Sequence, residues 1–479
     1  MFRLHFLSLI TTFLFTLFAV SDTHAQRSYN HHVNNRKHKI KVKTPLTSFE
    51  IEYEGEIIIS DNDQDIVGIT DGGYFKVKKS AFGSKRRVEI DADRNGRLTK
   101  KYYVGRREKT YVPDGEDWLA EMLPEVFRTT TLGAESRFER IYEKAGVDGV
   151  IDEIEHLDGD NVKTHYFGLL LRKGLTPDET SKVVETIGDE IDSDHYLSNL
   201  LMDNRDAFMV SDQSITAYIE ATESISSDHY LSEVLKDAIE DKSISESHVS
   251  KLLDISDSIS SDHYITEVFN SLLSDRTISD DNLRKVLVLS ESISSDHYKT
   301  EFLKEAINSR RSLNDTSLQL VLDALEDVVS DHYASVVIKE IKRQKLSDPM
   351  IAQVISYSAQ YISSDHYLSE SIREIINKHD IGNEGLEAII SGLDEIGSDH
   401  YASEVISDLS DQDNLTEDQL IKILDYVGDI NSDHYLAESL KELAPHVSEC
   451  GSGVTDAYRR AARNIGSETY YGRALKAID

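Results

Sequence analysis

Cysteine, proline and positive charge are all scarce in this chain. One cysteine, Cys450, among 479 residues excludes intrachain disulfides and any zinc cluster built on several cysteines. There are 6 prolines, and 52 Lys and Arg residues stand against 87 Asp and Glu, a net charge of −35. Because nucleic-acid binding needs clustered cations to contact phosphates, we expect no nucleic-acid partner.

Long apolar runs are missing beyond the first 25 residues. Hydrophobic residues make up 39% of the chain, which is too much for a disordered protein and is too dispersed for a multi-span membrane protein. Residues 4–20 do form a largely apolar run, between Arg3 and the small residues Thr23 and Ala25, and this predicts signal-peptidase cleavage before Gln26. An uncleaved membrane anchor is the alternative, disfavoured by the shortness of the run. We expect residues 1–25 to be a signal peptide and the protein to be exported, periplasmic or extracellular, with no stable membrane span after cleavage.

Catalytic motifs are also missing. The sequence contains no H-E-x-x-H, G-x-S-x-G, G-x-x-x-x-G-K-[ST] or G-x-G-x-x-G pattern. Cys450 with His446 nearby is a conceivable nucleophile, but a lone thiol in a loop is more often inert. We therefore expect no catalytic residues, no cofactor and no enzymatic activity.

The charge changes sign along the chain. Residues 26–112 hold 19 Lys and Arg against 12 Asp and Glu, a net charge of +7. Since residues 1–25 are neutral overall, residues 113–479 carry −42, and turn residues cluster at the boundary, in 113–115. The acidic surface favours solubility or adaptation to salt over a specific cationic partner.

The basic part predicts a small antiparallel β domain. Residues 26–47 are polar and are expected to form a basic arm, and apolar and polar residues alternate from residue 48 to 112. Gly72-Gly73 predicts a hairpin between 66–69 and 74–77, and Asn95-Gly96 a second one after 88–91. The Asp91–Gly96 segment matches half of an EF-hand loop, but a hairpin turn explains it better. Residues 113–131 are expected to form a connecting helix.

The strongest pattern is a repeated tetrapeptide. Ser-Asp-His-Tyr begins at residues 193, 227, 261, 295, 330, 364, 398 and 432, with spacings of 34 or 35. Such a period is typical of an α-solenoid, in which each helical hairpin buries its apolar face against its neighbours. We predict about ten helix pairs in residues 132–479. Their shape is expected to resemble TPR or HEAT arrays, although the Trp, Gly and Pro positions of a tetratricopeptide unit are missing.

Helix starts can be placed within each repeat. The residue before the motif Ser is expected to be the N-cap, which puts the motif Tyr at the fourth helical position, packed against the preceding Ile or Val. The motif Asp then lies in the first turn, where the helix dipole favours an anion. Partner helices are expected to start at Thr176, Ser245, Ser279 and Thr416.

The motif His raises the question of a metal. Six of the eight have Glu four residues later, on the same helix face, and such a pair could supply two ligands. The candidates are His229 and Glu233, His263 and Glu267, His297 and Glu301, His366 and Glu370, His400 and Glu404, and His434 and Glu438. Equivalent side chains of neighbouring repeats start about 10 Å apart, so the structural interpretation is favoured over a metal site.

The chain resembles a group of exported bacterial repeat proteins. The resemblance rests on Gly72-Gly73-Tyr74-Phe75 and Lys101-Tyr102-Tyr103-Val104 in the β-rich segment, on residues 118–125, and on the Ser-Asp-His-Tyr repeats. These proteins are uncharacterised, and similar repeats are attached to membrane zinc metallopeptidases of the β-lactam-sensor type. The resemblance implies an envelope setting with a sensory or regulatory context. The zinc motif and membrane spans of the peptidase are missing here, so it implies no protease activity.

From these observations we expect a mainly α protein, an α-solenoid preceded by a small antiparallel β domain. The expected function is a non-enzymatic binding or scaffold module of the cell envelope, whose solenoid surface engages a protein partner. The alternative is a metal- or pH-responsive protein, because eight imidazoles titrating together would change its acidic charge.

Overall fold

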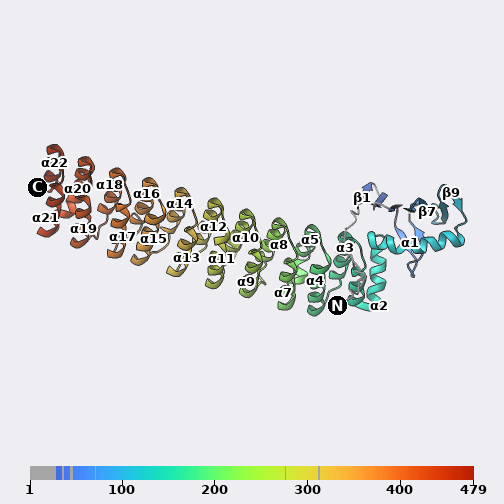
Figure 1. Ribbon diagram of the computed structural model, residues 1–479. Coiled ribbons are helices and arrows are strands. Elements are labelled where there is room, and N and C mark those ends of the chain that lie inside the picture. The colour runs from blue at the N-terminus through green and yellow to red at the C-terminus, as the bar shows by residue number, and fades with distance from the viewer. Residues whose placement is uncertain are drawn as a thin grey trace, which may run out of the picture. The chain divides into compact units, whose positions relative to one another are not determined.

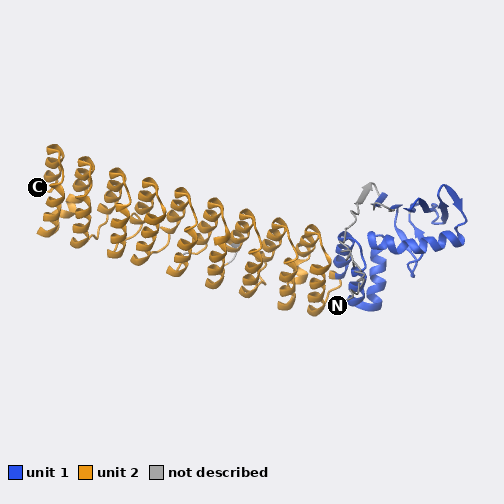
Figure 2. Ribbon diagram, in the orientation of Figure 1, with its two compact units in different colours: residues 1–170 blue, residues 171–479 orange. Residues whose placement is uncertain are grey.

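The computed structural model describes residues 28–34, 37–43, 47–70, 72–275, 277–310 and 313–478. The predicted signal peptide lies outside these residues and stays a prediction. The chain forms two compact units, residues 1–170 and 171–479 (Figure 2). No helix in the described part of the chain combines the length and the apolar character needed to cross a bilayer.

The first unit contains two antiparallel sheets. The larger has the strand order β1-β2-β3-β6-β7-β8-β9, and the smaller pairs β4 with β5. The strands are β1 (Ser28–Asn34), β2 (Lys37–Lys43), β3 (Thr47–Glu54), β4 (Ile57–Ile59), β5 (Ile66–Ile69), β6 (Tyr74–Ala81), β7 (Ser84–Ala92), β8 (Leu98–Val104) and β9 (Arg107–Lys109). The predicted small antiparallel β domain is therefore present.

Two details of that prediction are wrong. The segment expected to be a polar arm forms β1 and β2, because β2 pairs along its whole length with β3. Gly72-Gly73 does not close a hairpin, because β5 pairs with β4 whereas β6 pairs with β3 and β7. The Asn95-Gly96 hairpin is confirmed, and Asp93 accepts the backbone N–H groups of Asn95 and Arg97 at 2.8 and 2.9 Å, as a turn residue does.

The period-two pattern gives the larger sheet one apolar face. On β3, Phe49, Ile51 and Tyr53 are buried and belong to the same core as the side chains of α1 (Glu116–Thr129). Trp118 of this helix lies 5.8 Å from Tyr102, measured between ring centroids. The helix expected to be a connector thus completes the core of the sheet, and a short π-helix, η1 (Tyr111–Gly115), leads into it. The predicted boundary near residue 113 falls inside this unit.

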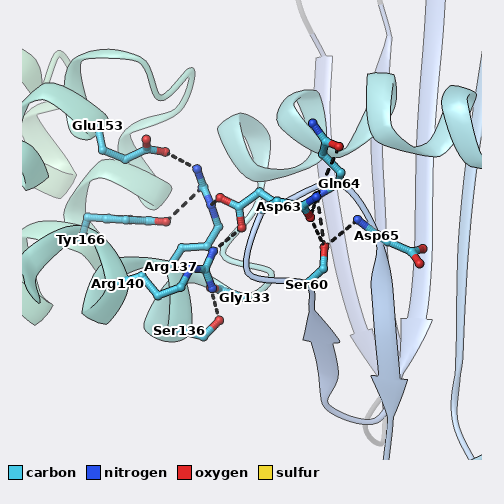
Figure 3. A network of polar contacts seen from close by, with 11 residues as sticks. Ser60, Asp63, Gln64, Asp65, Gly133, Ser136, Arg137, Arg140, Glu153 and Tyr166 are labelled. Atoms are coloured by element: carbon cyan, nitrogen blue, oxygen red, sulfur yellow. Dashed lines mark hydrogen bonds and ion pairs between the residues drawn. The ribbon is translucent and has the colours of Figure 1, made fainter. Parts of the chain in front are cut away.

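A buried arginine joins the smaller sheet to the next helices of the same unit (Figure 3). Arg137 of α2 (Ala134–Glu155) is only 8% exposed. It donates to Asp63, between β4 and β5, at 3.0 Å, and to Glu153 at 2.8 Å. It also lies 3.3 Å from the hydroxyl of Tyr166 on α3 (Asp160–Leu171). Because the cation is buried with two carboxylates, this network fixes the strand loop against the helices.

The second unit is a solenoid of helix pairs, which confirms the predicted fold class. Its described residues form nine pairs arranged in two rows (Figure 1). The first row consists of α5 (Asp194–Asp203), α8 (Asp228–Glu240), α10 (Asp262–Asp275), α12 (Asp296–Asn308), α14 (Asp331–Ile341), α16 (Asp365–Ile376), α18 (Asp399–Ser410), α20 (Asp433–Ser448) and α22 (Glu468–Ile478). The second row consists of α4 (Pro177–Glu190), α7 (Asp212–Thr222), α9 (Glu246–Ser256), α11 (Asp280–Leu289), α13 (Asp315–Leu325), α15 (Asp348–Tyr361), α17 (Asn383–Asp394), α19 (Glu417–Val427) and α21 (Ser452–Ala462). Two short helices, α6 (Arg205–Phe208) and the 3-10 helix η2 (Ser290–Ser292), interrupt the pattern.

Each helix packs mainly on the helix of the same row in the adjacent repeat. The second-row helices begin where the sequence predicts, with Thr176, Ser245, Ser279 and Thr416 as N-caps whose side chains accept a backbone N–H. In the first row, the predicted N-cap lies one residue too early in the sequence. The motif Ser is the N-cap, without a capping hydrogen bond from its side chain, in α5, α8, α12, α14, α16, α18 and α20, and the motif Tyr is the third helical residue.

Candidate interaction surface on the first-row helices

The motif Asp links each repeat to the next. Asp331, the first residue of α14, accepts the backbone N–H groups of Ser363 and Ser364 at 3.2 and 2.8 Å. The corresponding bond, of 2.8–2.9 Å, joins Asp194 to Ser227, Asp228 to Ser261, Asp262 to Ser295, Asp296 to Ser330, Asp399 to Ser432 and Asp433 to Ser467. Asp365 accepts from Gly397 at 3.3 Å. A carboxylate that accepts these N–H groups satisfies the backbone just before the next first-row helix, so the role of the Asp is structural.

The motif His and Tyr form a continuous row of rings. We call this the His–Tyr stripe, and it consists of His195, His229, His263, His297, His332, His366, His400 and His434 together with Tyr196, Tyr230, Tyr264, Tyr298, Tyr333, Tyr367, Tyr401, Tyr435 and Tyr470. Each imidazole centroid lies 5.0–5.4 Å from the Tyr ring of its own repeat. It lies 5.5–6.1 Å from the Tyr ring of the next. The rings therefore alternate without a break along the first row.

The two ring types differ in exposure. All eight imidazoles are exposed, and the tyrosines are half-buried except for Tyr196, which is 37% exposed. Five of the imidazoles, those of His229, His297, His332, His366 and His434, form no hydrogen bond and no ion pair with any described residue, whereas His195 contacts Asn199 at 3.2 Å. The tyrosines pack between neighbouring imidazoles, while most imidazole nitrogens face solvent.

The predicted metal candidates lie on this surface, but their carboxylates are engaged elsewhere. Every one of the six forms an ion pair of 2.7–3.0 Å with Lys or Arg: Glu233 and Glu267 with Lys236, Glu301 with Lys304, Glu370 with Lys339, Glu404 with Arg373 and Glu438 with Lys441. The hydrogen bond from Lys236 lowers the pKa of Glu267. Only two of the predicted pairs approach within 4 Å, His263–Glu267 at 3.5 Å and His400–Glu404 at 3.8 Å. No group of three possible ligands comes together among the described residues.

Cys450 and His446 do not form a nucleophile–base pair. The His446 Nε2 atom lies 2.6 Å from the carbonyl oxygen of Ser410. Burial, reinforced by the charges of Glu417 and Glu449, raises the pKa of the Cys450 thiol. Since thiolate chemistry needs a lowered pKa, this environment opposes nucleophilic activation.

The sequence identifies the stripe residues but not their contacts. Identical tetrapeptides show that the same side chains recur, and the spacing of repeats predicts that they lie on the same row. That a His contacts the Tyr of the next repeat depends on how the two helices pack. The cross-repeat bond of the motif Asp was likewise unforeseen.

Comparisons with known proteins add little to this description. No protein-family model matches the chain, and no curated protein matches it. Among solved structures, it is similar to a circular tandem repeat protein with a novel repeat topology and enhanced subunit contact surfaces, at 10% identity and a TM-score of 0.16, over 77% of this chain and 91% of that one. A second match, from work on the computational design of self-assembling cyclic homooligomers, has 12% identity and a TM-score of 0.09, over 74% and 93% of the two chains. TM-scores this low carry no argument about the fold, which is established by the helix pairs of this chain.

Proposed function

We propose that this protein is an exported, non-enzymatic scaffold of the bacterial cell envelope that binds a protein partner along the His–Tyr stripe. The observation that carries the proposal is the exposure of the same imidazole in eight consecutive repeats. The other motif residues have structural roles in this array, because the Asp bonds the next repeat and the Tyr is packed between rings. Packing against tyrosine rings does not by itself require a ring with two nitrogens, so the recurrence of His supports recognition through those nitrogens.

The repeating geometry favours an extended partner. Equivalent groups recur once per repeat, about 10 Å apart for packed helices, and a partner that lies along the row can contact several imidazoles at once. Each contact is weak, but contacts made by one partner reinforce one another. Export, the envelope setting and a regulatory context are supported by the sequence of residues 1–25 and by the resemblance described above.

The test compares two ways of changing the stripe. The imidazoles of His297, His332 and His366 form no hydrogen bond with a described residue, so replacing the three side chains removes no side-chain hydrogen bond. The triple Phe variant keeps aromatic contacts with the tyrosines and loses the ring nitrogens, whereas the triple Gln variant loses the aromatic ring. Each tagged protein is cross-linked in the native envelope fraction, and the captured proteins are identified by mass spectrometry.

We expect one reproducible partner with the wild type and at least a tenfold loss of it with both triple variants. The matched control, R284Q/T316A/Q353A, changes three exposed side chains of second-row helices and should keep the partner. Equal capture by the triple Phe variant and the wild type would assign the imidazoles to packing alone. Thermal melting of each variant separates lost binding from lost folding.

The alternative, a metal- or pH-responsive protein, needs the imidazoles to bind a cation or a proton. The ion pairs of the six glutamates with Lys and Arg disfavour a His–Glu metal site. Near-stoichiometric zinc per repeat in the purified protein would favour this alternative over the scaffold.

A further inference from the structure

The turn between β6 and β7 contains a residue that is unusual for its backbone conformation. Ala81 pairs with Ser84, so the hairpin loop is only Phe82-Gly83. Both residues have positive φ, +47° for Phe82 and +82° for Gly83, as a type I′ turn requires. Asn or Asp is favoured at the first of these positions, and a bulky residue there is strained.

Phe82 is also exposed to solvent. Phe82 is 84% exposed, whereas Phe49 of the adjacent strand β3 is buried. Burying a Phe side chain would stabilise the fold by about 1.5–3 kcal/mol, and the exposed Phe82 does not contribute this free energy. A strained backbone that presents an exposed aromatic ring points to a role outside the folding of the sheet.

Positive charge surrounds this turn. Lys85 and Arg86 follow it on β7, and both are exposed. The turn between β8 and β9 lies at the same end of the sheet, because Val104 pairs with Arg86 and the Gly105 N–H donates to the carbonyl oxygen of Lys85 at 2.7 Å. This turn adds the exposed Arg106 and Arg107. We call these four cations and Phe82 the basic tip.

Ion pairing differs between the middle of the sheet and the basic tip. In the middle of the sheet, Lys39 and Lys78 each lie 2.9 Å from Glu50, and Lys76 lies 2.9 Å from Glu89. By contrast, Lys85, Arg86, Arg106 and Arg107 form no ion pair with any residue in the described ranges. The nearest acidic residue in the sequence of these turns, Glu108, accepts from the Tyr103 hydroxyl at 3.4 Å. Residues 82–86 and 104–108 hold four cations and one carboxylate, so these two turns carry a net charge of +3.

We propose that the basic tip docks on a bilayer surface that carries anionic phospholipid. The four cations face lipid headgroups, and Phe82 enters the interface between headgroups and acyl chains. Lys and Arg near such a surface each strengthen binding about fivefold, and an inserted aromatic ring adds hydrophobic affinity. This inference concerns the first unit and does not depend on the partner of the His–Tyr stripe.

The test is sedimentation with two kinds of vesicle. One is phosphatidylcholine alone, and the other is an equimolar mixture of phosphatidylcholine and phosphatidylglycerol. All proteins are purified in the same processed form, so that any contribution of the N-terminus is identical. We expect the wild type to bind the anionic vesicles, to release them as salt rises, and not to bind the neutral ones.

Two variants probe the two parts of the basic tip. F82N places the residue preferred in a type I′ turn, so it should fold at least as stably as the wild type while binding about tenfold more weakly. R106Q/R107Q should weaken binding about twenty-five-fold. The matched control, R94Q/R97Q, removes two exposed arginines at the opposite end of β7 and should stay within about twofold of the wild type.

The insertion of the ring is measured separately. In F82W, the tryptophan emission should shift to the blue with anionic vesicles only, against a constant background from the buried Trp118. Equal binding by wild type and F82N, equal loss in R94Q/R97Q, or no vesicle binding would overturn the proposal. Binding to dextran sulfate that F82N retains and that vesicles do not compete would identify a soluble polyanion as the ligand instead.

Discussion

The two units of this chain distribute their stability in different ways. In the first, the strands and α1 share one core, in which Ile51, Val77 and Leu119 are fully buried, so each element depends on the others. In the second, a helix packs mainly on the equivalent helices of adjacent repeats. The comparison indicates that a destabilising substitution should lower the stability of the whole sheet in the first unit, but only that of neighbouring repeats in the solenoid.

The largest effect is expected from W118A in the first unit. Removing this buried side chain, which packs beside Tyr102, should lower the free energy of unfolding by about 3–5 kcal/mol. Hydrogen exchange measured by mass spectrometry should show β3, β6, β7 and β8 losing protection together. W118F is the control and should lower the free energy of unfolding by less than W118A does. Faster exchange in α1 alone would contradict the shared core.

F302A tests the same size of defect in the solenoid. Phe302 of α12 is fully buried and lies 5.4 Å from Phe269 of α10, between ring centroids. We expect a local loss of about 3–5 kcal/mol that increases exchange in α10, α12 and α14 and leaves α4 and α21 protected. The control is V288A, which truncates an exposed side chain of α11. A uniform increase along the solenoid would argue against independent repeats.

D331A removes one cross-repeat link. Two backbone N–H groups, of Ser363 and Ser364, lose their charged acceptor, and we expect a destabilisation of about 2–3 kcal/mol confined to α14 and α16. D331N keeps one acceptor oxygen and should have an intermediate effect. D413A removes an exposed carboxylate with the same charge and should leave exchange unchanged. If D331A behaves like D413A, the link contributes nothing measurable.

The smallest expected effect is a pH dependence of the first unit. Burial alone would raise the pKa of Glu50, but hydrogen bonds from Lys39 and Lys78 lower it to about 2. A carboxyl with a lowered pKa stabilises the fold above its ordinary value of 4.5, and this stabilisation is lost as pH falls from 4.5 to about 2.

The difference between wild type and E50Q isolates this dependence. At neutral pH, E50Q should lower the free energy of unfolding by about 1–2 kcal/mol, and this difference between the two proteins should disappear in acid. Thermal melting of both proteins across this pH range measures the difference in stability, and hydrogen exchange in β3 locates it. A gap that stays constant with pH would contradict the assignment to Glu50.

The sequence and the structure agree best where contacts are local. The second-row N-caps and the hairpin at Asn95-Gly96 follow from residues close together in the chain, and both are confirmed. The hairpin at Phe82-Gly83 was missed because Phe is not a turn residue. The basic arm was predicted without strands because its residues are mostly polar, although β2 pairs with β3 and buries Ile40 in the shared core.

The sequence by itself determined the repeat, its period, its helical nature and the identity of the residues that recur. It also determined the opposite charges of residues 26–112 and 113–479. Only the tertiary structure decided that the motif Asp bonds the next repeat, that His and Tyr rings alternate along one row, and that four cations at one end of the sheet form no ion pair with a described residue. The reason is physical: periodicity specifies which face of a helix or strand is buried, whereas distances between side chains of different elements depend on how those elements pack.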